Sequence, residues 1–149
     1  MIVYVGSDHQ GFEAKSLVLT YLKKAGYDAV DVGDEKLDPN DDFPVFAARA
    51  VAAIKTSNDN DPRAILICGS GQGMMMAANR FKGIRAGLGW STEAARSIRN
   101  DEDSNVLAMP SELLNAEIDI AQGIIDTWLK TPFAAATRYI RRNKELDEL

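Results

Sequence analysis

The sequence is poor in the residues that hold metals and disulfides. Its 149 residues include one cysteine, Cys68, and one histidine, His9. A single cysteine cannot form an internal disulfide, and one thiol with one imidazole is too few for a conventional zinc site. We therefore expect no bound metal, and no motif in the sequence requires a cofactor.

Positive charge and long apolar runs are also scarce. The chain carries 17 Lys and Arg against 22 Asp and Glu, a net charge of −5, which argues against a general nucleic-acid binder. No apolar stretch is long enough to cross a bilayer, and residues 1–5 run directly into polar residues without the pattern of a targeting signal. We expect a cytoplasmic protein that binds neither nucleic acid nor membrane.

What the sequence does contain is an alternation of short apolar runs with helix-like segments. The composition, 46% hydrophobic and 26% charged, is ordinary for a single globular domain spanning 1–149. The runs expected to form strands are 2–5, 28–32, 64–67, 84–88 and 106–109. Strands that alternate with helices predict an α/β three-layer sandwich, in which a five-stranded parallel sheet is covered on both faces.

Helices are expected between these strands and after the last of them. Their predicted spans are 12–25, 44–54, 73–80, 91–99, 111–129 and 134–149. The last helix is polar on most of its surface. We therefore expect residues 134–149 to form a C-terminal arm that docks on a partner subunit.

The most informative stretch lies at 65–79. An apolar run ends at Cys68, and Gly69, Gly71 and Gly73 then lead into helix-forming residues. Glycines let several backbone amides approach one ligand, and the thiol falls at the carboxyl end of a strand, where open α/β sheets bind ligands. A glycine-rich turn is also a common connection, and a lone cysteine is usually a core residue. The two features together favour a ligand-binding or catalytic site.

Three further groups of polar residues are candidates for the same site. Asp8 and His9 follow the first strand, although such a pair often only caps a turn. The loop at 101–105 is acidic, which is equally typical of a solvated loop. We expect these two loops and the Cys68 loop to meet at one sheet edge. Arg138 and Arg142 share a helix face, and they form either a clamp for a phosphate or a solvated cationic surface.

These residues resemble the type B ribose-5-phosphate isomerases and their sugar-phosphate isomerase relatives. Segment 6–15 is similar to the family's opening Ser-Asp-His-x-Gly-x-x-x-Lys, and 67–74 to its Ile-Cys-Gly-Ser/Thr-Gly-x-Gly. Further similar segments follow in the expected order at 77–80, 83–86, 105–108 and 128–133. The resemblance therefore covers almost the whole chain.

The resemblance implies a Rossmann-like parallel α/β fold in a metal-independent homodimer or homotetramer whose active sites are shared between subunits. It implies that Cys68 is the base that moves a proton between C1 and C2 of the sugar through an enediolate, with Ser70 assisting at the oxygens. The remaining implied roles are the anion hole at the amides of Gly69, Gly71 and Gly73, sugar contacts from Asp8 and His9, and a phosphate clamp from the partner's Arg138 and Arg142.

The chain departs from the family pattern at four places. Asp101 stands where the family places a ring-opening histidine, so Asp101 is the candidate for that step. Phe43 replaces a usual tyrosine, and Glu112 an arginine that some members have near the phosphate. One residue is added before the arginines, which makes Arg141 an alternative to Arg142 as the second phosphate ligand.

The sequence therefore predicts an aldose–ketose isomerase that interconverts ribose 5-phosphate and ribulose 5-phosphate. Two alternatives stay open. One is the same reaction on a tetrose or hexose phosphate, since the ring-opening and phosphate positions differ from the family. The other is a non-catalytic sugar-phosphate-binding protein on the same fold.

Overall fold

Five parallel strands form one sheet in the order β2-β1-β3-β5-β4 in the computed structural model, which describes all 149 residues. Their bounds are β1 Ile2–Ser7, β2 Asp28–Asp31, β3 Arg63–Cys68, β4 Ala86–Leu88 and β5 Val106–Pro110. Every pairing between neighbours is parallel. The predicted sheet, with its second strand at an edge, is confirmed.

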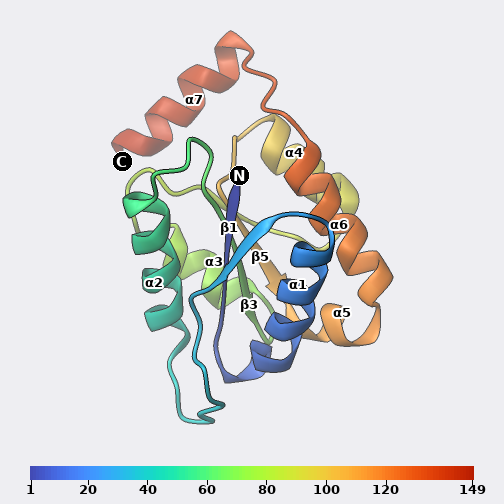
Figure 1. Cartoon of the computed structure of the whole chain (residues 1–149). Helices are drawn as coiled ribbons and strands as arrows, with labels where there is room; N and C mark the ends of the chain where they lie inside the picture. The colour runs from blue at the N-terminus through green and yellow to red at the C-terminus, as the bar shows by residue number, and fades with distance from the viewer.

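Helices cover both faces of this sheet (Figure 1). One face carries α1 Phe12–Lys24, α4 Thr92–Asn100, α5 Ser111–Ala116 and α6 Ile118–Lys130, while the other carries α2 Phe43–Thr56 and α3 Gln72–Ala78. A short 3-10 turn, η1 His9–Gly11, joins β1 to α1. The result is the three-layer α/β sandwich that the alternating pattern predicts.

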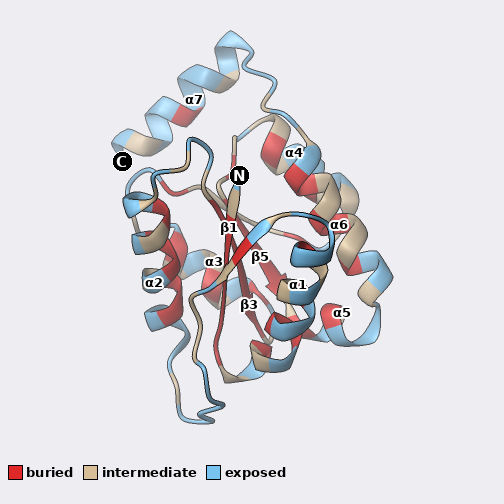
Figure 2. Cartoon of the chain, in the orientation of Figure 1, coloured by how far each residue is buried: buried red, intermediate tan, exposed pale blue.

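The strand β3 lies at the centre of the molecule, and all six of its residues are buried (Figure 2). Because alternate side chains of a strand point to opposite faces, Ile65 and Ile67 pack under α1 and α6, whereas Leu66 and Cys68 pack toward α2 and α3. The sheet thus fixes the direction of the Cys68 side chain.

Two helix boundaries differ from the prediction. The expected helix at 111–129 is broken at Glu117, whose φ of −138° and ψ of 59° are not helical. No proline or glycine stands at this break, so the sequence gives no local signal for it. The last helix, α7 Thr137–Glu148, starts three residues late because the Ala134 amide donates to the Asn100 carbonyl, and Ala135 has a φ of 51°.

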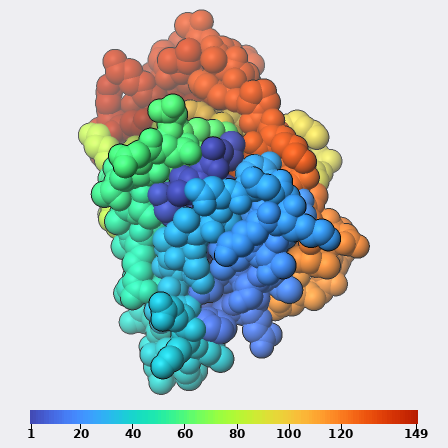
Figure 3. Space-filling view, in the orientation of Figure 1, coloured from blue at the N-terminus to red at the C-terminus, as the bar shows by residue number.

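The helix α7 lies on the outside of the domain, at the end of the molecule where β3 and β5 begin (Figures 1 and 3). Asn143 is the only buried residue of α7, and its side-chain Nδ2 donates to the Asp101 carbonyl at 3.3 Å. Arg85 bonds both carboxylate oxygens of Asp147, at 3.0 and 2.9 Å. These polar contacts hold the helix against its own chain, and its docking on a partner subunit stays a prediction.

Candidate active site

Cys68 is the last residue of β3 and is 6% exposed. The loop that follows enters α3 through Gly71, whose φ is 76°. A Cβ at Gly71 would lie 2.7 Å from Leu88 Cδ1 and 2.9 Å from the carbonyl carbon of Met109, so both the conformation and the space require glycine. Because α3 follows β3 in a parallel sheet, the N-terminus of α3 lies at the carboxyl edge of the sheet, where β3 ends at Cys68.

The η1 turn packs against the same end of β3. The Asp8 amide donates to the Ile67 carbonyl at 3.3 Å, and a Cβ at Gly11 would lie 2.7 Å from that oxygen. Gln10 reaches across to the cysteine loop, since its Oε1 occupies the space that a Cβ at Gly69 would fill. The structure therefore brings the Asp8–His9 turn and the cysteine loop together, as predicted.

Two side chains that the sequence analysis did not assign to the site cover the glycines. The Gln10 carboxamide lies on Gly69, and the Phe43 ring lies 3.1 Å from the Cβ position of Gly73. Ser70, which lies between Gly69 and Gly73 in the chain, is exposed. No local pattern marks Gln10, because it occupies a variable position of the motif that the sequence resembles.

Asp8 is a turn cap. Its Oδ1 accepts hydrogen bonds from the amides of Gln10, at 3.0 Å, and Gly11, at 3.2 Å. The side chain is buried, and this burial raises the pKa of the Asp8 carboxyl. The alternative that Asp8 caps a turn is therefore confirmed for Oδ1. Oδ2 makes no hydrogen bond within the chain and is available to a ligand.

His9 is paired with Asp41, a residue 32 positions away. Asp41 Oδ1 accepts from the His9 amide at 3.0 Å and lies 2.6 Å from His9 Nδ1. This hydrogen bond raises the pKa of the His9 imidazole. Asp41 could not be predicted from the sequence, because it lies in the irregular segment before α2 and only the fold brings it to His9.

The loop at 101–105 does not join this site within one chain, so that expectation was wrong. The loop precedes β5 rather than following it, and in a parallel sheet it therefore lies at the amino edge. Asn105 lies next to the start of β3, whereas Cys68 pairs with Pro110 at the far end of β5. The five residues of β5 span about 16 Å, which separates Asp101 from the thiol.

The arginines of α7 lie on the Asp101 side of the molecule. Arg138 is exposed, and its guanidinium stacks 4.8 Å from the Tyr139 ring centre. Arg141 lies 3.7 Å from Glu145, while Arg142 makes no ion pair. One chain thus carries two separate groups of predicted site residues, at opposite edges of its sheet.

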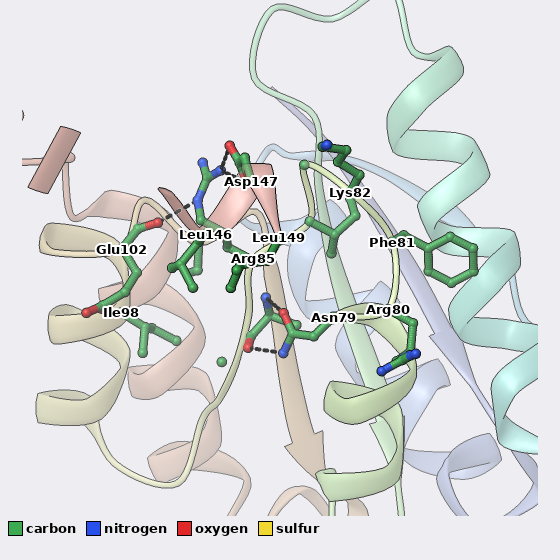
Figure 4. A pocket seen from close by; sticks show the side chains of 15 residues that line it. Asn79, Arg80, Phe81, Lys82, Arg85, Ile98, Glu102, Leu146, Asp147 and Leu149 are labelled. Atoms are coloured by element: carbon green, nitrogen blue, oxygen red, sulfur yellow. Dashed lines mark hydrogen bonds and ion pairs between the residues drawn. The ribbon is translucent and has the colours of Figure 1, made fainter. Parts of the chain in front are cut away.

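A cavity lies away from the thiol, between the start of β4 and the end of α7 (Figure 4). It encloses about 630 Å³, and its lining includes Asn79, Ile98 and Leu146. Arg85 and Asp147 form an ion pair at the rim of this cavity. The cavity therefore lies where the end of α7 packs on the domain. No cluster of three or more His, Cys, Asp or Glu residues is placed to hold a metal ion, and no helix has the length and apolarity to span a membrane.

The parallel sheet, the thiol at the end of its central strand and the adjoining glycine loop define an α/β enzyme of the Rossmann-like class. The chain belongs to the ribose/galactose isomerase family, whose model matches residues 3–146. It is therefore a sugar-phosphate isomerase of the ribose-5-phosphate isomerase type.

Three relatives show how close the similarity is. Ribose-5-phosphate isomerase B of Mycolicibacterium paratuberculosis is 35% identical over 95% of this chain and 87% of its own length. A 4-deoxy-4-sulfo-D-erythrose isomerase of Clostridium sp. is 44% identical over 73% of this chain and 67% of its own. The crystal structure of ribose-5-phosphate isomerase B from Mycoplasma genitalium with bound ribulose-5-phosphate has a TM-score of 0.88 at 34% identity, covering 99% of this chain and 94% of that one.

Proposed function

We propose that the chain interconverts ribose 5-phosphate and ribulose 5-phosphate by proton transfer through an enediolate, with Cys68 as the base. The observation that carries this proposal is the place of Cys68, at the carboxyl end of β3 and directly before the glycine loop. Relatives named ribose-5-phosphate isomerase B, one of them with ribulose-5-phosphate bound, support the substrate.

The glycine loop supplies what an enediolate needs. Removal of a proton from C2 of the aldose leaves negative charge on the sugar oxygens, and fixed amide donors stabilise charge at the place where it develops. In this proposal the amides of Gly69, Gly71 and Gly73 form that anion hole. The exposed hydroxyl of Ser70 relays protons between the oxygens, and Cys68 returns its proton to C1.

The separation of the two residue groups supports a site shared between subunits. Asp101 and the arginines lie at the amino edge, a strand's length from Cys68 of the same chain. A two-fold dimer pairs such edges reciprocally, so that each subunit completes the site of the other. We propose a homodimer, alone or within a homotetramer, in which Arg138 with Arg142 or Arg141 of one subunit holds the phosphate at Cys68 of its partner.

A second candidate substrate is a four-carbon aldose with a terminal phosphate or sulfonate. The relative named 4-deoxy-4-sulfo-D-erythrose isomerase is 44% identical over 73% of this chain. A four-carbon aldose with no free hydroxyl on C4 cannot close a furanose ring, and such a substrate needs no ring-opening acid. Asp101 stands at the ring-opening position in place of the histidine of the resembled family, and a four-carbon substrate makes no demand on that position.

A panel of aldose phosphates tests the function directly. We expect the purified wild-type protein to form the ketose from ribose 5-phosphate in a coupled assay, without added metal. The panel adds erythrose 4-phosphate, 4-deoxy-4-sulfo-erythrose and a hexose 6-phosphate, ranked by kcat/KM. A higher kcat/KM on a four-carbon compound favours the second candidate, and turnover of none of them favours a non-catalytic binding protein.

Replacement of the Asp101 carboxylate separates ring opening from proton transfer. If Asp101 opens the ring, Asp101→Asn lowers kcat on ribose 5-phosphate about 100-fold and leaves erythrose 4-phosphate nearly unaffected, since only the pentose cyclises. Glu102→Gln, which removes the next carboxylate, is the matched control, because Glu102 is exposed. Equal losses on both substrates would assign Asp101 a role other than ring opening.

A further inference from the structure

The pairing of His9 with Asp41 has a specific geometry. A single carboxylate oxygen, Asp41 Oδ1, lies within hydrogen-bond distance of both the backbone amide and Nδ1 of His9. An ionised carboxylate only accepts, so Nδ1 carries a proton and donates it. His9 Nε2 makes no hydrogen bond within the chain, and the side chain is 30% exposed. The second ring nitrogen is therefore free for a ligand.

Asp41 itself is held firmly. Its side chain is 8% exposed, although it belongs to an irregular segment between β2 and α2. The Asp41 amide donates to the Asp38 carbonyl at 3.2 Å, and α2 begins two residues later at Phe43, which lies against Gly73. The carboxylate is thus anchored to the same elements that build the cysteine loop.

The other titratable groups near His9 also favour its charged form. Asp8, at the end of β1, and Asp38, in the segment before α2, both act on His9 as negative charges. The η1 turn also packs on β3, the strand that ends at the Cys68 thiol. Burial acts in the opposite direction and is outweighed, so the pKa of His9 is raised.

We propose that Asp41 is a positioning residue that holds His9 as an imidazolium, with Nδ1–H bonded to Asp41 and Nε2–H directed at the anionic group of the substrate. This inference rests on the proposed function and adds to it the charge state of a binding residue. It also gives the Cys68 half of the site a cation of its own, so that binding of a phosphate or sulfonate does not depend on the partner's arginines alone.

The single histidine of the chain permits a direct test. Proton NMR of the imidazole signals reports His9 alone, because the sequence contains no other histidine. We expect the pH midpoint of the His9 titration in the wild type to lie above 6.5. Added sulfate, whose charge is constant over this pH range, should raise this midpoint further. In Asp41→Asn the midpoint falls toward 6.5, and the response to sulfate weakens.

Kinetics supply the second readout. The imidazolium is lost as pH rises through its pKa, so KM of the wild type increases on the alkaline side of that value. In Asp41→Asn the alkaline increase of KM begins at lower pH. At pH 7 the KM of this variant is about tenfold higher than that of the wild type, because a charged hydrogen bond to bound substrate is lost, while kcat changes little. Asp42→Asn removes the adjacent, exposed carboxylate, which makes no cap hydrogen bond, and serves as the matched control.

Each outcome decides one question. An unshifted His9 midpoint in Asp41→Asn overturns the inference, and so does a loss confined to kcat. A lower thermal stability with an unchanged midpoint would show a merely structural role and also overturns it. Absence of turnover in the wild type counts against the proposed function, yet the titration with sulfate still tests the charge and the anion contact of His9.

Discussion

Cys68→Ala is expected to lose at least about 1,000-fold in kcat, because a base that works on a carbon acid has no substitute in water at neutral pH. The side chain is small and lies at the end of a strand, so the fold should survive its shortening. The measurement is ketose formation, together with uptake of deuterium by substrate recovered from D2O. Both signals should disappear together, because both need the same proton removal.

The control for this variant is Ser16→Ala, which also removes one heavy atom, from an exposed position of α1. Its kcat should equal that of the wild type. Thermal unfolding of both variants shows whether the fold is kept. Deuterium uptake that persists in Cys68→Ala would assign the base to another group, whatever happens to net turnover.

Mixing two inactive variants should restore activity, and this is the second large effect. Cys68→Ala and Arg138→Ala each damage a different half of a shared site, so a mixed dimer contains one site with both halves intact. Random exchange in a dimer makes half of the molecules mixed, each with one of two sites, which predicts about a quarter of wild-type activity.

Exchange itself must be shown, for example by mass spectrometry of differently labelled subunits. The control mixture combines Cys68→Ala with the double variant Cys68→Ala/Arg138→Ala, in which no arrangement of subunits gives an intact site. Complete exchange without recovery in the first mixture would mean that Arg138 serves the Cys68 of its own chain or serves no site.

The sequence predicted the sheet and the cysteine loop because both follow from local patterns. β3 is an uninterrupted apolar run, which is typical of a parallel strand that is covered on both faces, and the glycines after it mark the turn. The turn of Asp8 and His9 was placed correctly for the same reason. A parallel sheet brings the carboxyl ends of its strands to one edge, so the order of elements sufficed.

The rest of the site depends on contacts between distant segments. Asp41 reaches His9 across 32 positions, and Phe43 reaches Gly73 across the sheet edge. Neither contact leaves a periodic signal. The loop at 101–105 was placed wrongly for a different reason. It precedes β5, so the order of elements already puts it at the amino edge, and the error was to group it with the loops that follow strands.

The position of these two edges also constrains the arrangement of the proposed dimer. If the amino edge of each sheet lies beside the carboxyl edge of the other, the strands of the two subunits run in opposite directions, and both catalytic centres span the interface between the subunits. A dissociated chain then contains every required side chain and yet no working centre. Specific activity should accordingly fall on dilution, and return as the protein is concentrated.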